Sequence, residues 1–162
     1  MPTLVDIVTN LVSTMRAVPS AGAVHPRARS ARTVEQIARL CTFEPDGYRG
    51  WVVQYLFSTE KDGRKLNTVE RTLRFRLWLV LPYDDDRTDG DTSTDAFNEM
   101  FEDMATRLRE DRSLGYCRPD VEHGLLQVEG EPAPVELSQA KGTAHVGRCR
   151  LDIRTFETVR SC

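Results

Sequence analysis

The densest group of possible metal ligands in this sequence is the acidic segment PYDDDRTDGDTS at residues 82–93. An EF-hand calcium loop needs oxygen ligands at alternate positions, then a glycine, and finally a glutamate that closes the loop. With Asp85 in the first position, Asp89 and the glycine after it fit this pattern. Arg87 stands where a ligand is needed, and Ala96 replaces the closing glutamate. These mismatches favour a solvated acidic loop, with a calcium or magnesium site as the alternative.

Histidine, cysteine and serine patterns give no catalytic signature. His25, His123 and His145 lie far apart, without the H-x-H or H-x-x-x-H spacing of zinc ligands. The cysteines are scattered without a C-x-x-C pair, so we expect reduced thiols. The serine elbow G-x-S-x-G and the glycine-rich loops of nucleotide-binding proteins are absent from the sequence. We therefore expect that the protein is not an enzyme and uses no cofactor.

Three arginines, Arg27, Arg29 and Arg32, cluster between the first two predicted helices. Arginines on an extended arm can contact the phosphates of DNA, and they can equally pair with carboxylates of a neighbouring subunit. A solvated loop is the third possibility. The formal net charge of −3 is too small to indicate a nucleic-acid-binding protein by itself. We keep the cluster as a candidate subunit contact.

Two stretches, TLRFRLWLVL at residues 72–81 and HVGRCRLDIRTF at residues 145–156, alternate between apolar and polar residues. A period of two places the apolar side chains on one face of a strand and the polar side chains on the other. Both stretches therefore suit one half-buried antiparallel sheet with an arginine-rich outer face. This arginine face would carry Arg74, Arg76, Trp78, Arg148, Arg150 and Arg154.

The arginine face has two interpretations. Acidic residues on neighbouring strands can pair with the arginines, and such exposed ion pairs contribute about 0–1 kcal/mol each. Alternatively, the face contacts another subunit, because arginine and tryptophan are enriched at interfaces. We treat it as a candidate subunit interface, together with a hairpin tip at Asp62 and Gly63.

The remaining elements would position these residues. Apolar residues recur at helical spacing along residues 3–16, along a short helix from Thr33, and along residues 95–111. We expect a hairpin with strands at residues 51–57 and 72–81 and a turn at residues 60–65, and shorter strands within residues 121–128 and 135–137. This order indicates an α+β fold with an antiparallel or mixed sheet and a long hairpin, packed on one face by amphipathic helices.

Length and composition limit the protein class. The 162 residues are expected to form a single domain, and 40% hydrophobic with 29% charged residues is typical of a soluble globular protein. No apolar run approaches the roughly 20 residues that a membrane span needs. The first residues do not form a secretory leader. We therefore expect a protein that stays in the cytoplasm where it is made and contacts no membrane.

In length and layout the sequence resembles the tail terminator, or tail completion, proteins of long-tailed bacteriophages, and more loosely their neck proteins. Those proteins are small α+β subunits that begin with an amphipathic helix like residues 3–16. A hairpin follows whose second strand is similar to residues 72–81, and then an acidic loop and a helix like residues 95–111. They end on a strand like residues 145–156. The resemblance covers nearly the whole chain and rests on pattern, spacing and length.

The resemblance implies a structural protein of the virion, located at the tail–neck junction and assembled in the host cytoplasm. Its implied partners are copies of itself in a ring of about six subunits, the tail tube protein, and the head-side connector or neck protein. The ring would end tube polymerisation, and genomic DNA would pass through it without sequence-specific binding. Asp84, Asp85 and Asp86 would face the lumen, where repulsion keeps passing DNA from sticking.

Two features do not fit this family, namely the basic segment at residues 27–32 and the proline-rich turn at residues 131–134. They are compatible with a head–tail connector or head completion adaptor at the same junction, which is the first alternative. A small enzyme or ligand-binding α+β domain is the second, because a fold does not settle function. An enzyme should show a concave pocket with convergent polar groups, whereas a ring subunit should show flat complementary flanks.

Replacing Asp84, Asp85 and Asp86 together by asparagine tests the lumen assignment. We expect slower DNA ejection, because removing three carboxylates per subunit removes repulsion between the lumen wall and the DNA. The DNA released per particle over time measures this. Particles that assemble normally and eject DNA at an unchanged rate would contradict the assignment.

Overall fold

The structure is a computed structural model that describes residues 2–26, 33–43, 47–63, 67–82, 92–116, 120–130, 133–136 and 143–158. Its helices are α1 (Leu4–Arg16), α2 (Val34–Leu40) and α3 (Thr92–Glu110). The longer strands are β1 (Ala23–Pro26), β4 (Gly50–Asp62), β5 (Thr68–Pro82) and β9 (Thr143–Thr158). The short strands are β2 (Thr42–Phe43), β3 (Gly47–Tyr48), β6 (Val121–His123), β7 (Gln127–Val128) and β8 (Ala133–Glu136).

A seven-stranded sheet forms the centre of the fold, in the order β1-β4-β5-β9-β6. The short strands β7 and β8 pair with β9 as β6 does. β1 runs parallel to β4 while the other pairs of this sheet are antiparallel, so the sheet is mixed. β2 and β3 form a separate pair. The expected α+β class with a mixed sheet and a long hairpin is confirmed.

The predicted alternation gives the sheet its main core face. Leu73 and Phe75 of β5 are buried, and so are their register partners Ile153 and Leu151 of β9. Because each apolar row of β5 lies beside an apolar row of β9, the two strands present one continuous hydrophobic surface. This surface is the floor of the main hydrophobic core.

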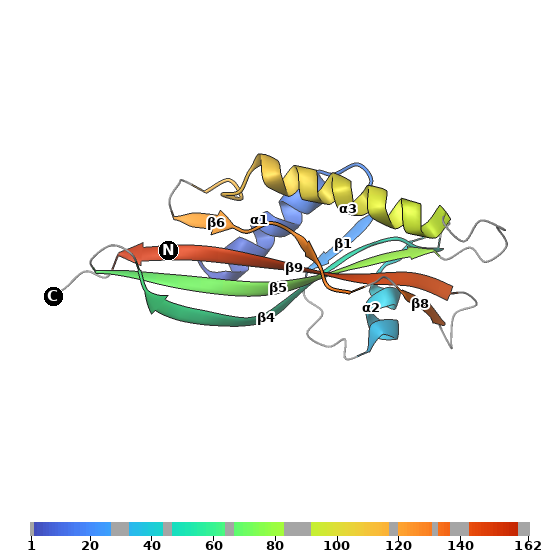
Figure 1. Ribbon diagram of the computed structural model, residues 1–162, viewed down its shortest axis with the longest axis horizontal. Helices are drawn as coiled ribbons and strands as arrows, with labels where there is room; N and C mark the ends of the chain where they lie inside the picture. The colour runs from blue at the N-terminus through green and yellow to red at the C-terminus, as the bar shows by residue number, and fades with distance from the viewer. Residues whose placement is uncertain are drawn as a thin grey trace.

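α1 and α3 cover this face of the sheet (Figure 1). α1 buries Ile7, Leu11 and Met15, which recur at about one helical turn. Thr3 begins the helix with a capping box, in which its hydroxyl accepts from the Asp6 amide and the Asp6 carboxylate accepts from the Thr3 amide. The predicted first helix is therefore confirmed in its position.

α2 lies on the opposite face of the sheet, where the sequence had predicted helices on one face only. Ile37 and Ala38 pack with Val52 and Trp78 in a second core cluster. The physical reason lies at the end of β5, where residues 78–81 are all buried. Both faces of the strand are apolar there, so both need a cover.

The other end of the sheet extends beyond the helices as a projecting arm, made of residues 58–62, 68–72 and 154–158 (Figure 1). Asp62 pairs with Val69, and the Gly63 amide donates to the Thr68 carbonyl at 2.7 Å. The turn predicted at residues 60–65 was therefore placed too early, and both strands of the hairpin are longer than expected.

A β-bulge interrupts β4 within this hairpin. Tyr55 pairs with Phe75, whereas Phe57 pairs with Arg74, so Leu56 is an extra residue in the strand. The ring centroids of Tyr55 and Phe75 lie 5.7 Å apart on the core side of the sheet. Phe57 lies on the arginine face instead, because the bulge reverses the alternation of the strand.

Gly147→Ala tests the close packing of α3 on the sheet. A Cβ at Gly147 would overlap the ring of Phe97, too close for carbon atoms without displacement. We expect the free energy of unfolding to fall by about 1–3 kcal/mol, measured by urea denaturation. Gly124→Ala is the matched control, since its Cβ would only approach the Asp152 carbonyl at 3.6 Å. Equal losses in the two variants would contradict this account.

Candidate functional site

The arginine face forms as the sequence predicted, and acidic side chains accompany it. Arg74 and Asp152 are register partners on β5 and β9. The Arg74 guanidinium donates to the two carboxylate oxygens of Asp152 at 2.9 and 3.0 Å, which makes a bidentate pair. The hydrogen bond with Asp152 raises the pKa of Arg74. The pair fixes β5 against β9 on the outer side of the sheet.

Three other arginines of this face also bond to side chains of this chain. The pairs are Arg76 with Glu129 at 3.0 Å, Arg154 with Glu122 at 3.0 Å, and Arg150 with Gln127 at 2.7 Å. The arginine side chains are each about one third exposed, so water screens the ionic pairs strongly. Pairing within the chain accounts for these side chains, and their role as a subunit interface stays a prediction.

Trp78 is only 9% exposed, unlike the exposed interface residue that the sequence suggested. The second core cluster under α2 buries its ring, and its indole nitrogen donates to Gln54 at 3.0 Å. The guanidinium groups of Arg76 and Arg148 lie 5.8 and 6.0 Å from its ring centroid. Little of the ring is left for contact with another subunit.

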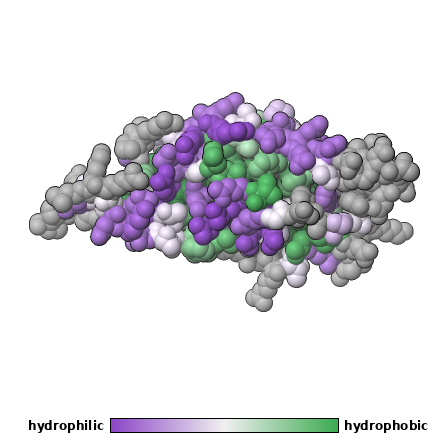
Figure 2. Space-filling model, viewed as in Figure 1, coloured by the Kyte–Doolittle hydropathy of each residue, from purple (hydrophilic) through white to green (hydrophobic). Residues whose placement is uncertain are grey.

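Large apolar side chains other than Trp78 are exposed. The large ones in the described part of the chain are Val5, Phe57, Leu125 and Val128. Figure 2 shows apolar residues gathered near the middle of one face, with hydrophilic residues around them. A small hollow of about 120 Å³ lies between α3 and the segment before β7, lined by Phe101, Glu102, Ala105, Arg109, Leu125 and Leu126.

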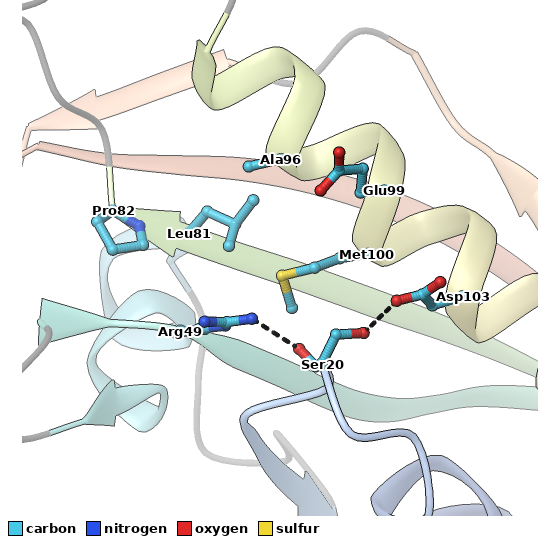
Figure 3. A pocket seen from close by; sticks show the side chains of 8 residues that line it. All are labelled: Ser20, Arg49, Leu81, Pro82, Ala96, Glu99, Met100 and Asp103. Atoms are coloured by element: carbon cyan, nitrogen blue, oxygen red, sulfur yellow. Dashed lines mark hydrogen bonds between the residues drawn. The ribbon is translucent and has the colours of Figure 1, made fainter.

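A larger open pocket of about 290 Å³ lies between α3 and the turn that follows α1 (Figure 3). The Ser20 hydroxyl donates to the Asp103 carboxylate at 2.6 Å, and the Arg49 guanidinium donates to the Ser20 carbonyl at 3.3 Å. Met100 and Leu81 supply apolar lining. Ser20, Arg49 and Asp103 are therefore engaged in holding the Ser20 turn in place, and the Glu99 side chain also lines the pocket.

His123 is buried and links the end of α3 to β6. Its Nδ1 lies 2.6 Å from the Gly124 carbonyl, and its Nε2 lies 3.3 Å from the Asp111 carbonyl. Arg112 donates to the carbonyl of His123 at 2.9 and 3.0 Å. Both ring nitrogens face backbone oxygens, so the geometry gives this histidine a structural role.

Asp111 closes the turn next to His123. Its carboxylate accepts from the Ser113 hydroxyl at 2.6 Å, from the Ser113 amide at 3.0 Å and from the Gly115 amide at 2.7 Å. The hydrogen bond from the Ser113 side chain is the main reason that the pKa of Asp111 is lowered. The turn then continues into Leu114 and Gly115, which both have positive φ.

Within the described residues, no three histidine, cysteine or acidic side chains lie close enough together to hold a metal ion. Cys41 and Cys149 are free and buried, and burial raises the pKa of each thiol to about 12. The predicted acidic loop at Asp84, Asp85 and Asp86 lies outside the described residues, and so does the basic cluster Arg27, Arg29 and Arg32.

Sequence reasoning missed the contacts that depend on long-range packing. Ser20, Arg49 and Asp103 meet although they are far apart in the chain, and no short motif announces them. The exposed apolar pair Leu125 and Val128 was also missed, since the sequence predicted only a short strand around them. The apolar residues before and within β7 were the signal in the sequence that could have indicated this exposed surface.

No protein-family model matches this chain, and no curated protein matches it. None of the helices in the described ranges is both long and apolar enough to cross a membrane. The resemblance to tail terminator proteins therefore stays a prediction.

Asp111→Asn tests the turn below α3. We expect the free energy of unfolding to fall by about 1 kcal/mol at neutral pH, because the amide cannot accept all three hydrogen bonds. Because the pKa of Asp111 is lower in the folded state, its carboxylate stabilises the fold at pH values above the unfolded pKa of about 3.9. This stabilisation is lost as the pH falls through the folded pKa. The difference from wild type should therefore shrink below about pH 4.

The exposed Glu157→Gln is the control for charge removal, and urea denaturation at several pH values is the measurement. This variant should stay within about 0.5 kcal/mol of wild type. A loss for Asp111→Asn that persists unchanged in acid would contradict the role of the carboxylate.

Proposed function

We propose that this protein is a structural subunit that caps the tail tube of a long-tailed bacteriophage. It ends polymerisation of the tube and joins it to the head-side connector or neck protein. It acts as a ring of identical subunits, about six by the resemblance, at the tail–neck junction of the virion.

The observation that carries this proposal is the projecting arm. Three strands continue beyond the helices, and most of β4 in the arm is exposed. β1 pairs with β4 only as far as Val53, and no other described strand lies along the outer edge of β4. An arm whose outer edge no described strand covers contributes little to its own core and suits contact with a neighbouring subunit.

The polar groups support a structural role over a catalytic one. A typical active site gathers polar side chains around a space for the substrate. In the pocket of Figure 3, the Ser20 hydroxyl donates to Asp103 and the Ser20 carbonyl accepts from Arg49. His123 and Asp111 are engaged in the same way at the end of α3.

A ring follows when each subunit contacts its neighbour through two different surfaces and the rotation closes. Such a ring has one face for the end of the tube and another for the connector. Each subunit carries a formal charge of −3, so the ring accumulates negative charge. This charge is compatible with passage of genomic DNA without binding, because it repels the phosphates.

Removing the gene from its phage tests the proposal. We expect tail tubes that grow past their normal length and stay unjoined to heads, because nothing stops polymerisation. Electron microscopy gives the distribution of tube lengths, and supplying the protein from a plasmid should restore it. Tubes of normal length that fail to join heads would contradict termination and favour the neck adaptor. Normal infectious particles would contradict both.

A further inference from the structure

Two exposed apolar surfaces lie on opposite flanks of the sheet. Phe57 is 48% exposed on β4, on the flank that continues into the projecting arm. Leu125 is 58% and Val128 is 45% exposed on the other flank, beyond β9. Phe57 lies on the part of β4 that no described strand covers, and an uncovered strand edge is a template for pairing with another chain.

We propose that these two flanks bind each other in neighbouring copies of this chain. The ring of Phe57 in one copy enters the hollow of the next copy, between α3 and the segment before β7. This inference rests on the proposed ring, because it names the two surfaces that join adjacent subunits.

The sizes of the two surfaces agree. The hollow has a volume of about 120 Å³, and Phe101, Ala105, Leu125 and Leu126 give it apolar walls. An apolar cavity of about 150 Å³ holds a whole benzene ring, so an open hollow of this size accepts most of a phenyl group. Phe57 is held outward for this contact, because the bulge turns it away from the core and the Arg74 guanidinium lies 5.2 Å from its ring centroid.

Charged groups of both signs lie beside the two surfaces. Exposed carboxylates, Glu60 and Asp62, follow Phe57 along β4. The Arg109 guanidinium stands at the rim of the hollow, where it pairs with Glu102 at 3.5 Å. Opposite charges at the edge of an apolar contact favour one orientation over others and accelerate association.

The backbone offers a second, compatible contact. Residues 54–62 of β4 have no described strand on their outer side, and β7 pairs only with β9 in the described part of the chain. A strand edge that meets another edge can continue the sheet across two molecules. The occupant is a second copy because one chain carries both halves of the contact on different flanks. Such a contact is head-to-tail and can close a ring.

Phe57→Asp and Leu125→Asp each remove one half of the contact. We expect each variant to lower the association constant at least about 30-fold, as measured by sedimentation velocity. Val5→Asp is the matched control, because Val5 is 54% exposed and lies on α1, away from both surfaces. If an aspartate variant fails to fold, Phe57→Thr and Leu125→Thr replace it in the same measurement. Urea denaturation shows whether each variant is folded.

Mixing the two variants gives the decisive result. Phe57→Asp keeps an intact hollow and Leu125→Asp keeps an intact phenyl group, so the mixture should form dimers of one copy of each and nothing larger. A two-fold contact through β4 would instead leave Leu125→Asp dimeric alone, which would overturn the proposal. A wild-type chain that stays monomeric at its highest soluble concentration, or variants that associate like Val5→Asp, would also overturn it.

Failure of this inference is distinguishable from failure of the proposed function. A ring that uses these surfaces but leaves tube length unchanged in the phage would contradict tube capping and keep the subunit contact. Tubes that overgrow when the gene is removed, together with Phe57→Asp subunits that still cap them, would keep tube capping and contradict this contact.

Discussion

Pairing of β5 with both neighbours is the constraint on which the rest of the structure depends. β5 bonds to β4 on one side and to β9 on the other, and the β9 register runs without a break from Thr68 to Pro82. Because side chains alternate along a strand, this register decides which residues of three strands share a face. A shift of β9 by one residue against β5 would turn Leu151 to the outer face and Asp152 to the core face, so the register is strongly specified.

The layers follow from this register. Where β5 alternates, only one face is apolar, and α1 with α3 covers it while paired charges occupy the other. Where β5 reads Trp-Leu-Val-Leu, both faces are apolar, and α2 covers the second one. Each helix therefore lies where the sheet would otherwise expose hydrophobic surface to water. Burial of such surface is the dominant favourable term in folding.

Much of this architecture could be predicted from local pattern. The alternation gave the right core residues on β5 and β9, and the helical spacing of apolar residues placed the first helix. The position of α2 on the opposite face of the sheet was not predicted, because the apolar stripe of a short helix does not indicate which face of a sheet the helix will cover. The unbroken apolar run of residues 78–81 was the available sign. Pairings such as Arg76 with Glu129 depend on where edge strands lie, and no local pattern contains that information.

The bulge at Leu56 also has a consequence for the selection of partners. A free edge strand normally accepts almost any extended chain, which is why exposed edges promote aggregation. The bulge breaks the regular spacing of amide and carbonyl groups near the start of residues 54–62, the part of β4 that no described strand covers. An arbitrary flat strand can therefore satisfy only part of this ladder, whereas a surface shaped to receive a displaced aromatic side chain can use the irregular point itself. In this way one inserted residue makes this edge a poorer template for promiscuous cross-β association.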